Sequence, residues 1–147
     1  MKAVIVYYSG TGNTQTLANL ISQSLFKLGI LHDIFDIAKI KSFQDISLEY
    51  DLYILGCPAM GFEELEKLDF RPLFDYLLPN LLGKNIALFG SYSWGNGEWM
   101  TKWEQEVLKS KAKLIQKGLI IKDQSKENDY DKVNNFVINL VRRQNEN

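Results

Sequence analysis

A run of apolar, β-favouring residues near the N-terminus leads directly into a segment rich in glycine and hydroxyl groups. The run is AVIVYY, from Ala3 to Tyr8, and it shows no alternation of apolar and polar residues. Such a strand is buried on both faces, which is typical of parallel sheets covered by helices on either side. The opening unit therefore restricts the chain to folds in which strands and helices alternate.

The alternation continues to the end of the chain. Further apolar runs predict strands at 32–37, 50–57, 84–91 and 119–122, and the last of these is a short edge strand. Five strands separated by helical segments predict an α/β doubly wound sandwich, a five-stranded parallel sheet with helices on both faces. A chain of 147 residues is too short for two ordinary domains, so a single domain over 1–147 is expected.

Apolar residues at helical spacing mark the segments between the strands. The first such segment contains Leu17 and ends before Gly29, which is placed as a C-terminal cap. The second carries Pro72 near its first turn, where a missing N–H matters little. The third segment contains Met100, Trp103, Val107, Leu114 and Ile115, and the fourth contains Val133, Phe136, Val137, Leu140 and Val141, with Asp129 and Asp131 as candidate N-caps.

Composition excludes several classes of function. The formal net charge of -1 argues against a nucleic-acid-binding surface, which needs a clustered excess of lysine and arginine. One cysteine, Cys57, and one histidine, His32, can form neither an internal disulfide nor an ordinary zinc site, so no metal is expected. No stretch approaches the roughly 20 apolar residues of a membrane span, so a cytoplasmic protein is predicted.

The segment after the first strand has the composition of an anion-binding loop. Backbone N–H groups and the positive end of a helix dipole converge where such a loop enters a helix. The candidate donors are the backbone amides from Ser9 to Thr14 and the hydroxyls of Ser9, Thr11 and Thr14, while Gly10 and Gly12 allow close approach. Asn13 stands where the nucleotide triphosphate loop has its lysine, and the third glycine of the dinucleotide motif is missing. A phosphate monoester on a tightly bound cofactor fits this loop, and a plain helix cap without a ligand is the alternative.

Two more loops follow central strands and should lie at the same edge of the sheet. They are GCPAMGFEELE at 56–66, with Met60, and GSYSWGNGEWM at 90–100, with Tyr92 and Trp94. Large flat or soft side chains beside glycines could sandwich a planar ring between the two loops. Ordinary packing of Met60, a place in the helix core for Trp99, a buried inert Cys57 and a structural His32 are the competing interpretations.

These three loops together resemble the flavin mononucleotide (FMN) loops of the short-chain flavodoxins. The matching segments are SGTGNT after the first strand, CPAMGFEE after the third and GSYSWGNGEWM after the fourth. The resemblance implies a flavodoxin-like fold with strand order 2-1-3-4-5 and FMN as the cofactor. It implies that residues Ser9 to Thr14 bind the phosphate.

The resemblance also implies roles for the other two loops. Met60 would cover one face of the flavin ring and Trp94 the other, while Glu63 would contact the pyrimidine edge. The backbone at Gly61 would meet the reactive ring nitrogen. The cofactor-binding residues expected in these loops are Ala59, Met60, Gly61, Phe62, Glu63, Ser91, Tyr92, Ser93, Trp94 and Gly95.

The function implied by the resemblance is that of an electron carrier and not of an enzyme. The chain would hold FMN non-covalently and cycle mainly between its semiquinone and hydroquinone at low potential. Its partners would be reductases, oxo-acid oxidoreductases or radical-enzyme activators that meet the monomer at the flavin edge. An FMN enzyme of the quinone reductase type, or a radical-enzyme activator, is the alternative on the same scaffold. A receiver-type signalling module is set aside, because Gly56, Cys57 and Pro58 stand where its phosphoacceptor aspartate is needed.

The sequence departs from the flavodoxin pattern at a few positions. Phe62 replaces a residue that is often acidic, Ser93 and Asn96 replace a glycine and an aspartate, and the net charge is near zero where the family is strongly acidic. If Met60 to Glu63 form a tight turn, positive φ at Gly61 leaves Phe62 at an ordinary angle. The opposite turn type would impose positive φ on Phe62 at about 1–2 kcal/mol, so the sequence favours one carbonyl orientation.

Overall fold

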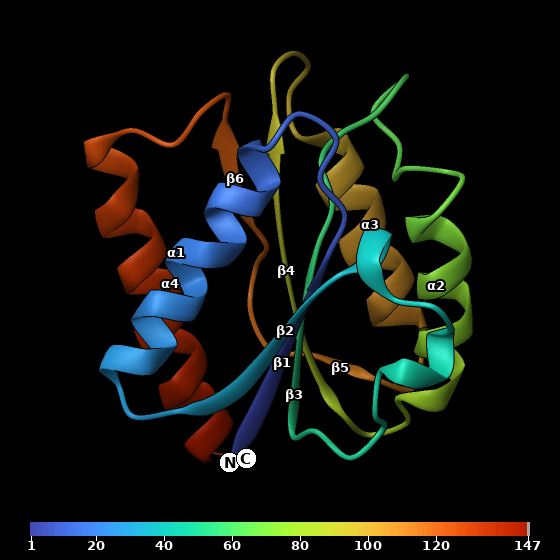
Figure 1. Cartoon of the computed structure of the whole chain (residues 1–147), viewed down its shortest axis with the longest axis vertical. Helices are drawn as coiled ribbons and strands as arrows, with labels where there is room; N and C mark the ends of the chain where they lie inside the picture. The colour runs from blue at the N-terminus through green and yellow to red at the C-terminus, as the bar shows by residue number, and fades with distance from the viewer. Residues whose placement is uncertain (147) are drawn as a thin grey trace.

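A parallel β-sheet lies between two layers of helices in the computed structural model, which describes residues 1–146 (Figure 1). The strands are β1 (Lys2–Tyr7), β2 (Leu31–Asp36), β3 (Leu52–Gly56), β4 (Asn85–Tyr92), β5 (Lys113–Leu114) and β6 (Leu119–Lys122). The order is β2-β1-β3-β4-β5, with β6 also paired to β4, and every pairing is parallel. The predicted fold class and strand order are confirmed.

The fifth position of the sheet is occupied by two short strands. β5 pairs with the first two residues of β4, and β6 pairs with its last four, from Phe89 to Tyr92. The predicted edge strand at 119–122 is therefore confirmed, and β5 is a small addition that was not predicted. Both segments complete the edge of the sheet because β4, at eight residues, is long enough to pair with each of them in turn.

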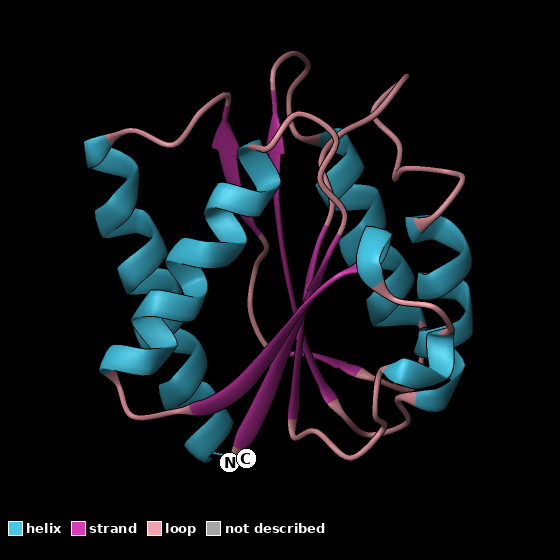
Figure 2. Cartoon of the chain, viewed as in Figure 1, coloured by secondary structure: helices cyan, strands magenta, loops and turns pink. Residues whose placement is uncertain are grey.

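The helices cover both faces of the sheet (Figure 2). They are α1 (Asn13–Lys27), α2 (Phe70–Leu77), α3 (Glu98–Lys109) and α4 (Glu127–Glu146), with short 3-10 helices η1 (Ile37–Lys39), η2 (Phe43–Asp45) and η3 (Leu78–Asn80). α1 and α4 pack on one face, and α2 and α3 pack on the other. Pro72 lies in the first turn of α2, and Gly29 follows α1 with a φ of 72°, as predicted.

The predicted extension of α3 through Leu114 and Ile115 is wrong. α3 ends at Lys109, and the hydroxyl of Ser110 accepts the N–H of Ala112 to turn the chain. Leu114 lies in β5, and the N–H of Ile115 donates to the carbonyl of Ile86 at 3.1 Å. Hydrogen bonding to β4 therefore decides the conformation of Leu114 and Ile115, although the spacing of these two apolar residues also fits a helix.

The predicted N-caps of α4 are also misplaced. The helix begins at Glu127, so Asp131 lies within it and Asp129 lies in its first turn. The carboxylate of Asp129 accepts the backbone N–H of Lys126 at 2.9 Å, which closes the helix start from inside the first turn. This is the back-reaching half of a capping box, which uses an acidic residue three positions after the cap.

Buried apolar side chains fill the space between the sheet and each helical layer. Trp99 and Trp103 of α3 are each 1% exposed, so the interpretation of Trp99 as helix core is confirmed. The ring of Trp103 meets Phe70 and Phe74 of α2 edge-on, at centroid distances of 5.3 and 5.8 Å. These contacts join α2 to α3 and hold the loop that precedes each helix close to the same edge of the sheet.

His32 has a structural environment, as expected. Its Nε2 and the hydroxyl of Ser22 are 2.7 Å apart, and its Nδ1 lies 2.9 Å from the carbonyl of Ile30. These contacts join α1 to the start of β2, at the end of the sheet opposite the three glycine-rich loops. Within residues 1–146, no helix is long and apolar enough to cross a membrane.

Candidate functional site

The three loops singled out in the sequence meet at the carboxyl ends of the strands (Figure 1). The hydroxyls of Thr14 and Ser91 lie 2.7 Å apart, which joins the first loop to the end of β4. The N–H of Ala59 donates to the carbonyl of Ser91 at 3.0 Å, which joins the second loop to the same point. Ser91 therefore links all three loops through one residue.

The first loop presents several free hydrogen-bond donors. The hydroxyl of Ser9 accepts the N–H groups of Gly12 and Gln15, both at 3.1 Å, and this contact fixes the loop around its own start. The N–H groups of Gly10, Thr11, Asn13 and Thr14 make no hydrogen bond with any residue that the structure describes. Unpaired N–H groups at the beginning of a helix are suited to hydrogen-bonding an anion such as a phosphate.

The hydroxyls of the first loop differ in what they can offer a ligand. Thr11 is exposed, whereas Thr14 is 1% exposed and is engaged with Ser91. Ser9 already accepts two N–H groups, so its own proton remains available for donation. Thr14 therefore has a second role that was not predicted from the sequence, which is to hold the loop against β4.

The second loop forms a turn that is one residue longer than the predicted turn. Met60 and Glu64 exchange both backbone hydrogen bonds, at 2.9 and 2.8 Å, around three central residues. Gly61 has a φ of 53°, and Phe62 is not among the residues with positive φ, so the expected angles at these positions are confirmed. Glu63 takes a φ of 53°, a left-handed conformation that was not predicted for it.

Large apolar side chains stand on the rim formed by the second and third loops. Phe62 is 88% exposed and Trp94 is 52% exposed, while Met60 is partly exposed. Because Phe62 is so exposed, its ring does not pack against a neighbouring side chain of the described residues. Tyr92 is half-buried against Trp99, with ring centroids 5.5 Å apart, and Ser93 and Gly95 lie exposed beside Trp94. The rim is therefore apolar and aromatic, in keeping with a planar ligand.

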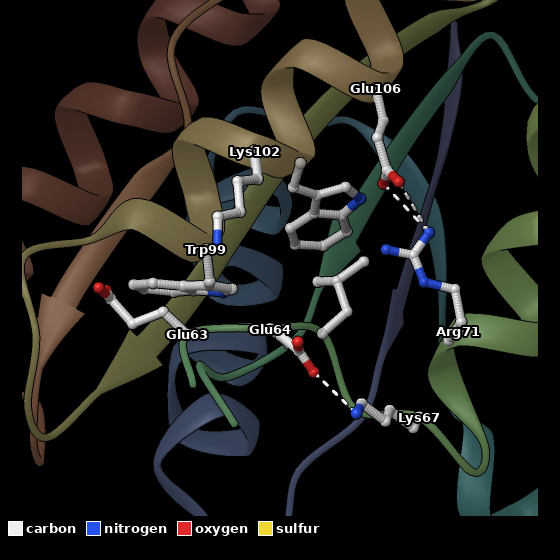
Figure 3. A pocket seen from close by; sticks show the side chains of 9 residues that line it. Glu63, Glu64, Lys67, Arg71, Trp99, Lys102 and Glu106 are labelled. Carbon is white, nitrogen blue, oxygen red and sulfur yellow. Dashed lines mark hydrogen bonds and ion pairs between the residues drawn. The ribbon is translucent and has the colours of Figure 1, made fainter. Parts of the chain in front are cut away.

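Glu63 connects the second loop to the beginning of α3. One carboxylate oxygen, Oε1, accepts the N–H groups of Gly97 and Glu98, both at 2.9 Å. The side chain is 6% exposed, and a Cβ atom at Gly95 would lie 2.6 Å from its carboxyl carbon. Figure 3 shows this carboxylate beside the indole of Trp99. Glu63 thus caps α3 from 34 residues away, and its other oxygen, Oε2, makes no hydrogen bond with any residue that the structure describes.

Two further residues near the site were missed in the sequence. Glu66 is 5% exposed and accepts the N–H groups of Leu68, Asp69 and Phe70 at 2.8 Å each, which caps α2. Tyr8 lies half-buried directly before the first loop, where desolvation and the nearby carboxylates of Glu66 and Asp69 raise its pKa. An acidic residue shortly before a predicted helix was the available signal for Glu66.

Cys57 is a buried thiol at the end of β3, as predicted. It is fully buried, and burial raises its pKa to about 12. Because the thiolate is the reactive form, we expect no reaction of the folded protein with Ellman's reagent at pH 8 and one thiol per chain after denaturation. Rapid labelling of the native protein would contradict this prediction.

The comparisons with known proteins agree with this geometry. The family model described as Flavodoxin matches residues 5–135. The chain is 42% identical over 120 residues to a flavodoxin of Megasphaera elsdenii, covering 79% of this chain and 83% of the relative. It is 36% identical over 127 residues to a flavodoxin of Clostridium beijerinckii, covering 86% and 91%.

The solved structures give the same result. The solution structure of two-electron reduced Megasphaera elsdenii flavodoxin aligns with a TM-score of 0.79 at 37% identity, covering 94% of this chain and 98% of that one. Both the sequence and the arrangement of the three loops thus lead to one conclusion. The chain belongs to the flavodoxin family, whose members are FMN-binding electron-transfer proteins.

Proposed function

We propose that this chain is a low-potential one-electron carrier that holds FMN non-covalently between its three loops. The observation that carries the proposal is the set of unpaired N–H groups at the start of α1, in a loop without any basic side chain. Such a site binds the phosphate by hydrogen bonds and the helix dipole alone. Residues Ser9 to Thr14 are the proposed phosphate ligands.

The rim residues place the flavin ring. Met60 covers one face of the ring and Trp94 the other, and Ala59, Ser91 and Tyr92 lie along the ribityl chain. Their positions on two loops joined through Ser91 support this arrangement. Oε2 of Glu63 would accept a hydrogen bond from the pyrimidine edge of bound FMN, while Oε1 keeps its contacts with the start of α3. The carbonyl of Gly61 meets the ring nitrogen, and Phe62, Ser93 and Gly95 complete the contact surface.

Bound FMN supplies the capacity to take up one electron at a time, and the protein sets which states are stable. Two apolar side chains against the ring disfavour an additional negative charge, because they exclude the water that would solvate it. We expect the carrier to cycle mainly between the one-electron and two-electron reduced states. Redox partners then dock at the exposed rim around Phe62 and Trp94, with the protein acting as a single-domain cytoplasmic monomer.

Stepwise anaerobic reduction followed by visible spectroscopy tests this function. Flavin bands that pass through a blue, one-electron reduced form before bleaching are the expected result. Direct bleaching without that form contradicts one-electron transfer and indicates two-electron chemistry. A colourless protein that stays colourless with added FMN contradicts the assignment of the first loop as a phosphate site.

Phe62 is expected to influence the first one-electron potential through the turn. Phe62→Gly removes the preference for negative φ at this position, so both orientations of the Gly61 carbonyl become accessible. In the parent protein the second orientation would impose positive φ on Phe62 at a cost of about 1–2 kcal/mol, and removing that cost corresponds to a shift of roughly 40 to 90 mV for one electron. Redox titration of the FMN-loaded protein measures the shift.

Phe62→Leu is the matched control, because leucine keeps both the apolar character and the restriction on φ. It should leave the first potential within error of the parent protein. Equal potentials in all three proteins would contradict the role of backbone conformation at this position. Equal shifts in both variants would assign the effect to the aromatic ring instead.

A further inference from the structure

A cavity lies beside the second loop, between the segment 63–67 and helices α2 and α3 (Figure 3). Its volume is about 520 Å³, which is large enough for a small organic molecule. Only Glu63 belongs both to its lining and to the expected FMN contacts. The cavity is lined by Glu63, Glu64, Leu65, Lys67, Arg71, Trp99, Lys102, Trp103 and Glu106.

The carboxylates of the cavity already have partners. Glu64 pairs with Lys67 at 3.0 Å, and a dashed line marks this pair in Figure 3. Glu106 accepts two hydrogen bonds from Nη1 of Arg71, at 3.0 and 3.1 Å. The third carboxylate, on Glu63, accepts the N–H groups at the start of α3. Because all three carboxylates already have hydrogen-bond or ion-pair partners, the cavity does not favour a cationic ligand.

Two hydrogen-bond donors of the cavity have no partner. Lys102 forms no ion pair with any residue of the described chain, and its ammonium group lies above the indole of Trp99 in Figure 3. The indole N–H of Trp103 is buried and has no hydrogen-bond partner among residues 1–146, and Trp103 is 1% exposed. A buried unpaired donor of this kind is destabilising unless an acceptor reaches it.

The shape and polarity of the cavity lining further restrict the class of ligand that fits. Leu65 and the indoles of Trp99 and Trp103 form an apolar wall, whereas the charged groups stand on flexible side chains. Lys102 is exposed and Arg71 is partly exposed, so both long side chains have room to move when a ligand enters. A ligand that satisfies both free donors needs an anionic acceptor attached to a flat apolar body.

We propose that this cavity binds a small organic carboxylate with an aromatic or similarly flat apolar group. The carboxylate pairs with the ammonium of Lys102 and accepts the indole N–H of Trp103, and the flat group lies against the apolar wall. The proposal does not depend on the assignment of FMN to the other site. The proposed ligand is a free small molecule. An acidic side chain of another protein could present the same carboxylate, and the experiment below distinguishes the two.

Titration with sodium phenylacetate, followed by ¹⁵N NMR of the tryptophan indole groups, tests the proposal on the oxidised, FMN-supplemented protein. Trp103→Phe assigns the Trp103 resonance by its disappearance. We expect a saturable shift of that resonance, and at least a fivefold weaker affinity in Lys102→Met. Lys109→Met removes an exposed lysine of the same helix outside the cavity and should bind like the parent protein.

Two comparisons make the outcome decisive. Phenylacetamide has the same shape without the charge, and it should give no saturable shift. An absent shift with phenylacetate, or equal responses to the acid and the amide, would overturn the proposal. Saturable binding of an acetyl-Asp-Phe-amide peptide without binding of free phenylacetate would overturn it in favour of a protein ligand. Loss of flavin binding leaves this test unaffected, because the indole signals are read directly.

Discussion

Gly12→Ala is expected to weaken FMN binding by about 5- to 30-fold. Gly12 precedes α1 with a φ of 101°, a backbone conformation that L-residues rarely adopt. No heavy atom lies within 4 Å of the position of an added Cβ, so the penalty arises from the backbone and not from a clash. A strain of roughly 1–2 kcal/mol is relieved only by rotating the loop, which moves its N–H donors away from the phosphate. Quenching of FMN fluorescence on titration with the apoprotein measures the affinity.

Gly29→Ala provides a matched control for this backbone effect. Gly29 has a φ of 72° at the end of α1 and likewise has open space around its Cβ position. Alanine there should lower the free energy of unfolding by about 1 kcal/mol and leave the FMN dissociation constant unchanged. An equal loss of affinity in both variants would show that general destabilisation, and not the geometry of the loop, reduces binding.

Glu63→Ala is expected to lower the free energy of unfolding of the apoprotein by about 2–4 kcal/mol. The substitution leaves the N–H groups of Gly97 and Glu98 without their acceptor, at a site where the side chain is 6% exposed. A buried donor without a partner costs about 1–3 kcal/mol, and a carboxylate at a helix N-terminus adds a favourable charge–dipole interaction. In a protein of this size, the melting temperature should fall by roughly 5 to 10 °C.

Two variants separate the capping contact from other effects. Glu63→Gln keeps an acceptor oxygen and should lose less than half as much stability as Glu63→Ala. Glu64→Ala removes the neighbouring carboxylate, which is 44% exposed and paired only with Lys67, and should change stability by less than about 1 kcal/mol. Equal melting temperatures for the alanine variants of Glu63 and Glu64 would contradict the capping role of Glu63.

The sheet could be predicted from the sequence because each strand has a strong local signal. The runs that became β1, β3 and β4 are continuous, apolar and bounded by glycine or polar residues, so burial on both faces was evident. The prediction for α3 failed beyond Lys109 because Leu114 and Ile115 satisfy a helical period and a strand equally well. Only the pairing with β4, which depends on residues far away in the chain, decides between the two.

In the candidate site, too, local features could be predicted from the sequence and contacts between distant residues could not. The position of the loop from Ser9 to Thr14 before α1, with its unpaired N–H groups, was predictable because a helix start is formed by a continuous segment. The contact of Glu63 with α3 was not predictable, because its acceptor and donors lie 34 and 35 residues apart. The link between Thr14 and Ser91 spans 77 residues and was likewise hidden. The resemblance suggested the site residues, and the fold shows the contacts that join the three loops.

The ends of the described chain lie at the edge of the sheet opposite the three loops (Figure 1). β1 begins there at Lys2, and Gln144 near the end of α4 accepts a hydrogen bond from Asn85, the first residue of β4, at 2.8 Å. A tether attached at either end would therefore point away from the rim that bears Phe62 and Trp94. Immobilised on an electrode or fused to another domain through these ends, the protein would keep the proposed electron-transfer face turned outward.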